Sequence, residues 1–317
     1  MINQDIVAGI DIGGTNTAYG LIDHTGKTLY SSSIKTNSDE GAISFFKRLA
    51  DEINKALSLI PEKTILTGIG IGAPNANYYT STIENPPNLN WGYVDVKKIM
   101  SEYFDVPLVI TNDANAAALG EMKFGAAKNM KDFIVITLGT GLGSGIVSGG
   151  QLIYGHDGMA GEIGHTIVFY GGRECGCGRK GCLETYVSAT GICRTALEFL
   201  SNYQDASELR KFTKETLTSK DIFTAAKKGD SIALRAFDFT CRILGFKLAD
   251  SVAHTSPEAI FLTGGLANAG ELIFDSTKRY MEENLLFSYK NKVKLLPSGL
   301  DNNYAAILGA AALVTSL

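Results

Sequence analysis

The chain has 317 residues, of which 45% are hydrophobic and 20% charged, a composition that supports a sizeable core and argues against global disorder. Its formal net charge of -4 and its pI of about 5.7 argue against a nucleic-acid binder, because such proteins neutralise phosphates with lysine and arginine. No apolar run approaches the roughly 20 residues that span a bilayer, and a strand-like pattern begins where a signal peptide would stand. We therefore expect a cytoplasmic protein of two domains or one large one.

The first part of the chain has the pattern of a β-meander followed by a helix. Residues 5–14, 17–23 and 28–36 are apolar or alternating runs that predict three consecutive strands. Residues 38–59 predict a helix, because apolar side chains recur there at helical spacing until Pro61 ends the pattern. The apolar positions of this helix are Ile43, Phe46, Leu49, Ile53 and Leu57.

The next part alternates between strands and less regular sequence. Residues 64–74 predict a buried strand, and residues 75–91 predict a long polar loop with too little periodicity for a helix. Residues 106–113 predict another strand, and residues 114–127 a helix whose small side chains allow close packing.

The pattern then restarts. Residues 132–153 again read as strand, Gly/Thr turn and strand, about 126 residues after the first such hairpin. Residues 185–253 are mostly helical in pattern, residues 258–270 predict a strand, a Gly-Gly turn and a helix, and residues 302–317 a final helix. We therefore expect a duplicated α/β domain with a cleft between the copies.

Two Gly/Thr turns are candidates for phosphate binding. Backbone N–H groups of a Gly-rich turn converge on a phosphate when no side chains obstruct them, and Thr15 adds a hydroxyl donor at residues 13–15. Asp11, at the end of the preceding strand, is placed to hold a magnesium ion through water. The alternative is an ordinary tight hairpin, but a second such turn at residues 139–141 favours a clamp for a polyphosphate. Neither the P-loop pattern nor the dinucleotide-binding pattern fits.

A third Gly-rich turn lies at residues 263–270, after a strand and before a helix. Its two glycines allow a flat ligand such as an adenine ring to lie against the backbone. An ordinary strand-to-helix turn explains the same residues equally well.

Asn112 and Asp113 stand where a strand ends and a helix begins. Asx residues are favoured there as helix N-caps. A carboxylate at a strand end is also the expected general base that takes a proton from an attacking hydroxyl group. Both roles remain open at this point.

Three of the five cysteines cluster in the segment CGCGRKGCLE, which begins at residue 175. Cys175, Cys177 and Cys182 together with His165 make a Cys3His set, a normal complement for structural zinc. A Cys175–Cys177 disulfide would be strained, and the redox alternative lacks C-x-x-C spacing. The segment therefore favours a zinc site.

These motifs together resemble the ROK family (repressors, open reading frames, kinases) of the actin-like ATPase superfamily, which includes hexokinases. The resemblance covers essentially the whole chain, and the nearest branch is that of the bacterial glucokinases. It is carried by DIGGTN, TNDANAAALGE, LGTGLGSGIV, GEIGH, CGCGRKGCLE and LTGG. It implies a duplicated actin-like (RNase H-like) α/β fold with two domains and an interdomain cleft. We expect residues 1–117 with 303–317 to form the small domain, and residues 118–302 the large domain with the zinc site.

The resemblance also implies a role for each matching residue. Asp113 would be the base that deprotonates the 6-hydroxyl group of a hexose. The residues implied to hold the sugar are Asn88, Asn112, Asp113, Glu162, His165 and Glu184. The residues implied to surround the nucleotide and its magnesium ion are Asp11, Gly13, Gly14, Thr15, Asn16, Thr140, Gly141, Gly264 and Gly265. The residues implied to bind zinc are His165, Cys175, Cys177 and Cys182. Asn88 follows two prolines, and a turn-forming role explains it equally well.

The reaction that the resemblance implies is transfer of the γ-phosphoryl group of ATP to a hexose hydroxyl group, most simply that of glucose, with Mg2+ on the phosphate oxygens. Kinases of N-acetylmannosamine, N-acetylglucosamine, fructose or allose are alternatives within the same family. A sugar-sensing repressor is a more distant alternative, and Asp11 stands too near residue 1 for a helix-turn-helix domain before it. A zinc module without enzyme activity would leave the phosphate turns and Asp113 without a purpose. The family further implies a homodimer.

Overall fold

The structure, a computed structural model, describes residues 4–60, 64–301 and 303–315. Contacts divide the chain into two compact units, and each is described by itself. Unit 1 comprises the described residues of Met1–Met130, Leu152–Ala160 and Gly299–Leu317, and unit 2 those of Lys131–Gln151 and Gly161–Ser298.

Unit 1 is built on a five-stranded sheet of the order β3-β2-β1-β4-β8. The first three strands are an antiparallel meander, and β4 and β8 continue the sheet in parallel to β1. The strands are β1 (Gln4–Ile12), β2 (Asn16–Asp23), β3 (Thr28–Lys35), β4 (Thr64–Gly72) and β8 (Leu108–Thr111). The predicted meander and the two later strands are thus confirmed.

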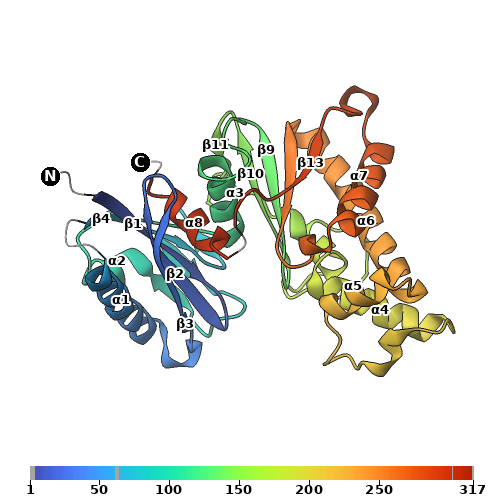
Figure 1. The fold of residues 1–317 in the computed structure, drawn as a ribbon, viewed down its shortest axis with the longest axis horizontal. Coiled ribbons are helices and arrows are strands. Elements are labelled where there is room, and N and C mark those ends of the chain that lie inside the picture. Colours follow the sequence, from blue (N-terminus) through green and yellow to red (C-terminus); the bar gives the residue numbers. More distant parts are fainter. Residues whose placement is uncertain (1–3, 61–63, 302, 316–317) are drawn as a thin grey trace. The chain divides into compact units, whose positions relative to one another are not determined.

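Helices cover both faces of this sheet (Figure 1). On one face lies α1 (Ala42–Leu59), which buries Phe45, Phe46 and Leu49 against the strands. Ile43 was expected on this buried face but is 70% exposed, because Phe45 occupies the inward position in the first turn. The short α2 (Val96–Met100) packs beside α1.

The other face of the sheet carries α8 (Ala305–Ala312), with α3 (Asp113–Lys123) packed along it. The central strands admit this helix because Gly9 and Gly70 lack a side chain: a Cβ atom at either position would overlap a carbonyl oxygen of α8. The same holds where the two helices meet, since a Cβ atom on Gly120 would lie 2.8 Å from the Cα atom of Gly309.

The domain boundary lies elsewhere than expected. A boundary between residues 117 and 118 would cut α3, which packs on α8 inside unit 1, and the chain instead leaves unit 1 after Met130. Residues 152–160 also return to unit 1, an excursion that the sequence did not predict.

The segment 75–91, expected to be an irregular loop, contains part of a small antiparallel sheet. Its strands are β5 (Ala76–Asn77), β6 (Thr82–Glu84) and, further along, β7 (Tyr93–Asp95). Strands of two or three residues are too short to show alternation, so the sequence pattern missed them. Asn75, Ser81 and Asn85 make the turns, each with a positive φ angle.

Unit 2 repeats the sheet of unit 1 in the order β11-β10-β9-β12-β13. The strands are β9 (Phe133–Leu138), β10 (Leu142–Ser148), β11 (Gln151–Leu152), β12 (Ala259–Thr263) and β13 (Lys294–Pro297). As in unit 1, the first two strands pair antiparallel, and the fourth and fifth strands run parallel to the first. The matching strand order confirms the duplication predicted from the two hairpins.

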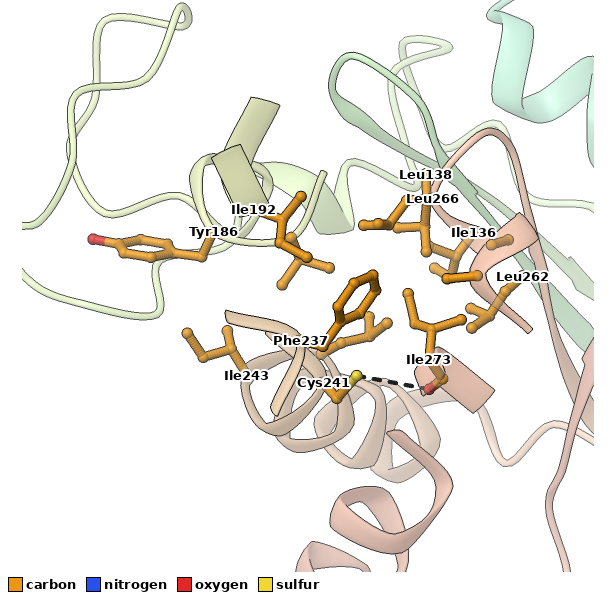
Figure 2. Close-up of a cluster of buried hydrophobic side chains, with 14 of the residues drawn as sticks. Ile136, Leu138, Tyr186, Ile192, Phe237, Cys241, Ile243, Leu262, Leu266 and Ile273 are labelled. Carbon is orange, nitrogen blue, oxygen red and sulfur yellow. Dashed lines mark hydrogen bonds between the residues drawn. The ribbon is translucent and has the colours of Figure 1, made fainter. Parts of the chain in front are cut away.

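The helices of unit 2 form its hydrophobic core against this sheet. They are α4 (Ala189–Asn202), α5 (Ser219–Lys227), α6 (Ser231–Thr255) and α7 (Glu271–Asn284). Figure 2 shows Phe237 of α6 pointing among Ile136, Leu138 and Ile273. Burying each such side chain stabilises the fold by about 1.5–3 kcal/mol. Cys241 is fully buried in this core.

Short 3-10 turns connect these elements. They are η1 (Ser38–Glu40), η2 (Ile163–His165), η3 (Leu183–Thr185), η4 (Glu208–Lys211), η5 (Ala267–Ala269) and η6 (Phe287–Tyr289). Among the helices of the described ranges, none combines the length and the apolar character needed to cross a bilayer.

Candidate functional site

The first Gly/Thr turn joins β1 to β2 in unit 1. The Gly13 N–H group donates to the Asn16 carbonyl oxygen at 3.1 Å, and Thr36 holds the turn by donating its hydroxyl group to the Gly13 carbonyl oxygen at 2.7 Å. In the described part of the chain, the N–H groups of Gly14 and Thr15 make no backbone hydrogen bond. They are therefore available to an anion, whereas that of Gly13 is used within the turn.

Asn88 lies against this turn. A Cβ atom on Gly14 would stand 2.9 Å from the Cβ atom of Asn88 and 3.1 Å from its carbonyl oxygen. The close approach requires glycine at residue 14. The structure thus places the predicted sugar-contacting asparagine next to the predicted phosphate turn.

Two carboxylates meet at the ends of β1 and β8. Gly72, at the end of the intervening β4, lies close to both: a Cβ atom there would stand 3.7 Å from Oδ1 of Asp11 and 3.6 Å from the Cα atom of Asp113. Burial, with a further contribution from the Asp113 charge, raises the pKa of Asp11 to about 7. A carboxyl group of this kind gains from a neighbouring cation, and Asp11 therefore fits a magnesium ligand.

Asp113 is the first residue of α3. Desolvation by the surrounding protein raises the pKa of its carboxyl group, and a hydrogen bond from the Ala114 N–H group opposes this increase. The residue nevertheless has an exposed surface. The raised pKa suits a group that must accept a proton.

Asn112 caps the same helix. The Ala114 N–H group donates to Oδ1 of Asn112 and to Oδ1 of Asp113, both at 2.8 Å. The N-cap interpretation is therefore correct for Asn112. The Ala114 N–H group contacts only Oδ1 of Asp113 and leaves Oδ2 of that carboxylate outside this hydrogen bond.

The second Gly/Thr turn joins β9 to β10 in unit 2, and a different set of hydrogen bonds holds it. The Gly139 N–H group donates to the Gly141 carbonyl oxygen at 3.1 Å, and Thr190 of α4 donates its hydroxyl group to the Thr140 carbonyl oxygen at 2.8 Å. Glu184 covers the far side of the turn, since a Cβ atom on Gly141 would lie 2.6 Å from its Oε2. A larger residue at position 141 would therefore displace the Glu184 carboxylate.

Glu184 also reaches the cluster around His165. Its Oε1 lies 3.7 Å from Nδ1 of His165, while Nε2 of the same ring lies 3.9 Å from Oε2 of Glu162. Ser144 of β10 holds this segment, because its hydroxyl group donates to the Gly161 carbonyl oxygen and accepts from the Ile163 N–H group. Unit 2 thus brings together three of the predicted sugar-binding residues.

The predicted zinc ligands form one compact group. One ligand atom from each of His165, Cys175, Cys177 and Cys182 lies within 4.8 Å of all the others. The sulfur atoms of Cys177 and Cys182 are 3.7 Å apart, and Sγ of Cys175 lies 3.6 Å from Nδ1 of His165. A tetrahedral zinc ion with ordinary bond lengths would separate two sulfurs by about 3.8 Å and a sulfur and a nitrogen by about 3.6 Å. The donor set therefore fits zinc.

Arg179 supports the cluster, and sequence reasoning missed it. Its guanidinium group donates to the His165 carbonyl oxygen at 2.8 Å. Burial acts against ionisation of Cys177, but hydrogen bonds from Arg179, together with those from Cys175 and Cys182, outweigh it and lower the pKa of the thiol to about 6. The position of Arg179 between Cys177 and Cys182 in the chain was the available signal, and for Ser144 the signal was a serine within the Gly-rich LGSG.

The third Gly-rich turn follows β12. Gly264 has φ of +91°, and a Cβ atom there would lie 2.7 Å from the Leu138 carbonyl oxygen, so its backbone packs against the end of β9. Gly265 is exposed, with open space where a side chain would stand. The backbone at Gly265 is therefore accessible to a ligand.

Comparison with known proteins places the chain in a family. The model of the ROK family matches residues 7–316, and the chain belongs to that family. It is 37% identical over 310 residues to a glucokinase of Halalkalibacterium halodurans, covering 96% of this chain and 94% of that protein. It is 29% identical to a xylose repressor of Caldicellulosiruptor bescii, over 99% of this chain and 80% of that protein.

A solved structure is similar throughout its length. The ROK family glucokinase from Streptomyces griseus, crystallised with glucose and AMPPNP, superposes with a TM-score of 0.81 at 33% identity, covering 97% of this chain and 98% of that one. The expected ROK membership and the actin-like α/β fold are therefore confirmed.

Proposed function

We propose that the protein is an ATP-dependent glucokinase, which transfers the γ-phosphoryl group of ATP to the 6-hydroxyl group of glucose. The observation that carries this proposal is the pair Asp11 and Asp113, two strand-end carboxylates with raised pKa values beside a Gly-rich turn. Similarity to glucokinases over nearly the full length of both chains supports it.

In this proposal Asp113 is the catalytic base. Its carboxylate accepts the proton of the 6-hydroxyl group as that oxygen attacks the γ-phosphorus atom, and the bond from phosphorus to the bridging oxygen of ADP breaks. Proton transfer of this kind contributes about 10²–10⁴-fold to a rate. The rest of the acceleration comes from positioning and from charge neutralisation.

The two turns and Gly265 hold the nucleotide. The N–H groups of Gly14 and Thr15 donate to phosphate oxygens, with the Thr15 hydroxyl group beside them. Magnesium, when bound, is held through Asp11 and neutralises the phosphate oxygens. The residues that we assign to the nucleotide and its metal ion are Asp11, Gly13, Gly14, Thr15, Asn16, Thr140, Gly141, Gly264 and Gly265.

The remaining polar side chains bind the other hydroxyl groups of the sugar. Carboxylates accept from hydroxyl groups and amides both donate and accept, so these residues can discriminate the positions of hydroxyl groups on a pyranose. The residues assigned to the sugar are Asn88, Asn112, Asp113, Glu162, His165 and Glu184.

Zinc, held by His165, Cys175, Cys177 and Cys182, is a structural ion in this proposal. The set is a closed one with four protein ligands, which leaves no position for substrate. Holding Nδ1 of His165 fixes the ring, so that Nε2 remains on the side of Glu162.

The test is release of ADP in a coupled assay with glucose, mannose, fructose, N-acetylglucosamine and N-acetylmannosamine. The proposal predicts the highest kcat/KM with glucose. A higher kcat/KM with an N-acetylhexosamine or with fructose would show that this sugar, and not glucose, is the preferred substrate. The proposed kinase activity would then still stand. Absence of turnover with every sugar, combined with retained glucose binding, would favour a sugar-sensing regulator, a role to which the similarity to xylose repressors points.

We further propose a homodimer in the cytoplasm, where ATP is available and the cysteines stay reduced. The candidate contact surface is a groove of about 430 Å³ on unit 2, at the end of α4 and along α6, and it is lined by Phe199, Tyr203, Leu234 and Phe239 together with the charged Arg235, Asp238 and Arg242. Two of these side chains, Tyr203 and Leu234, are 38% and 40% exposed. Light scattering after size-exclusion chromatography tests it, and a mass of 33.9 kDa at micromolar concentration would contradict it.

A further inference from the structure

The segment Leu152–Ala160, here called the strap, lies between two stretches of unit 2 but belongs to unit 1. Aromatic packing fastens it there. The Tyr154 ring of the strap stacks on Tyr78, with ring centroids 4.0 Å apart and planes 13° from parallel. The Tyr79 hydroxyl group donates to the Gly155 carbonyl oxygen at 2.9 Å.

Asn77 is the central polar contact of the strap. Its Nδ2 donates to the Asp157 carbonyl oxygen at 2.9 Å, and its Oδ1 accepts from the Tyr79 N–H group at 3.0 Å. The residue is 6% exposed. Gly158 allows this approach, because it has φ of +87° and a Cβ atom there would lie 2.7 Å from Oδ1 of Asn77. The carbonyl group of Asp157 and the backbone of Gly158 thus both lie against the buried side-chain amide of Asn77.

Asn77 is also connected to the strand that ends at the base. It is the second residue of β5, and the first, Ala76, donates its N–H group to the Ala73 carbonyl oxygen at 3.3 Å. Ala73 donates its own N–H group to the carbonyl oxygen of Thr111, two residues before Asp113, at 3.0 Å. Backbone hydrogen bonds therefore connect the anchor of the strap with the end of the strand that precedes α3.

The far end of the strap leads into the proposed hexose-binding motif. Ala160 is its last residue, and Glu162 follows two residues later. Two peptide units span at most about 7 Å. Whatever fixes Ala160 therefore restricts where the backbone of Glu162 can lie.

We propose that Asn77 is a positioning residue for hexose binding: by fixing the strap, whose last residue stands two before Glu162, it restricts where the backbone of Glu162 can lie when a sugar binds. This inference rests on the proposed function, since it needs Glu162 to contact a hexose. Asn77 touches neither sugar nor nucleotide in this scheme and acts through the strap alone.

The test is the variant Asn77→Asp, which keeps the size and the acceptor of the side chain but removes the donor to Asp157. Because a misplaced contact weakens substrate binding, we expect KM for glucose to rise about 10-fold, and the Kd for glucose without nucleotide to rise in parallel. KM for ATP should stay within about twofold. The matched control is Asn54→Asp, the same chemical change at an exposed position of α1.

A second variant, Tyr79→Phe, removes only the hydroxyl bond to Gly155 and keeps the ring. It should raise KM for glucose by a smaller factor, about 2–5-fold, and it covers the case in which Asn77→Asp does not fold. Tyr93→Phe, at a 68% exposed tyrosine of β7, is its control.

The variant Glu162→Gln distinguishes failure of this inference from failure of the proposed function. If Glu162→Gln weakens glucose binding and the folded strap variants do not, the positioning role of Asn77 is overturned and the proposed function stands. Equal increases of KM for glucose and for ATP would show a merely structural role and would also overturn it. If Glu162→Gln leaves glucose binding unchanged, the proposed sugar contact itself fails.

Discussion

The two Gly/Thr hairpins have the same topology but different chemistry at the strand end. In unit 1 the first strand ends with Asp11, whose pKa is raised to about 7. In unit 2 the residue at the same place before the turn is Thr137, whose hydroxyl group accepts a hydrogen bond from the Gly143 N–H group at 3.2 Å. The side chain in unit 2 thus closes its own hairpin, whereas the one in unit 1 is a buried carboxylate, which we propose to be a magnesium ligand.

The units differ again further along the chain. In unit 1 the fifth strand, β8, leads directly into α3 and Asp113. Unit 2 has no such helix after β13 in the described residues, and it carries instead the segment with Glu162, the cysteine cluster and Glu184. The two units thus share one framework, and in the proposed function unit 1 carries the base and the magnesium ligand, whereas unit 2 carries the zinc ligands and the two glutamates assigned to the sugar.

The largest effect is expected from Asp113→Asn. Loss of the base should lower kcat by about 10²–10⁴-fold, while the Kd for glucose changes little because the amide keeps the size and an acceptor of the side chain. Steady-state kinetics and calorimetric titration with glucose measure the two quantities. Near-normal kcat in the folded variant would show that Asp113 is not the base. The proposed contrast between the two units would then fail as well.

Asp11→Asn tests the charge that distinguishes the first hairpin, through the pH dependence of stability. The raised pKa means that the folded wild type binds this proton up to about pH 7, whereas an unperturbed carboxyl group has a pKa of 3.8. The stability that Asp11 contributes is therefore full below pH 3.8 and is lost as the pH rises to 7. Relative to the wild type, the variant should gain about 1–3 kcal/mol between pH 4 and pH 8.

Urea unfolding at the two pH values measures this gain. An equal difference between variant and wild type at both would show that Asp11 titrates as an ordinary carboxyl group. In the same experiment series, the turnover of the wild type should fall as the pH drops below about 7, because protonated Asp11 no longer favours a cation.

Cys177→Ser tests the ordering role of unit 2. The variant should lose zinc by elemental analysis, and KM for glucose should rise about 10-fold, because His165 is no longer held in one orientation. KM for ATP should change less. Cys193→Ser, outside the cluster, is the matched control. Retained metal, or unchanged glucose kinetics after its loss, would refute the proposed role.

The smallest effect is expected from Thr137→Val, the counterpart of the Asp11 variant in the second hairpin. Losing the acceptor for the Gly143 N–H group should reduce the free energy of unfolding by about 0.5–1.5 kcal/mol. The kcat value should stay within about twofold. A decrease in kcat similar to that of Asp11→Asn would mean that the two strand ends are chemically equivalent after all.

The local features of this molecule were largely predictable from its sequence. The duplicated hairpins, the buried strands and the grouping of His165 with three cysteines follow from residue type and spacing, and the structure confirms the hairpins, the strands and the grouping. These features depend on contacts between residues close in the chain or on a repeated pattern, which a sequence displays directly.

Features that depend on distant parts of the chain were not predictable. The strap returns to unit 1 because Asn77 and Tyr78 bind it there, and neither residue carries a signal for a partner some 80 residues later. The boundary expected at residue 117 failed for a similar reason, since small residues in α3 and α8 allow packing that only the fold reveals. Strands as short as β5 and β6 leave no alternation to read.

The most direct test of the central claim is identification of the phosphorylated product by ³¹P NMR, with ATP, Mg2+ and glucose as the starting materials. We expect glucose 6-phosphate and ADP in equal amounts, and product formation slower by about 10²–10⁴-fold when Asp113→Asn replaces the wild type. A different phosphorylated position, inorganic phosphate as the main product, or unchanged ATP would contradict it.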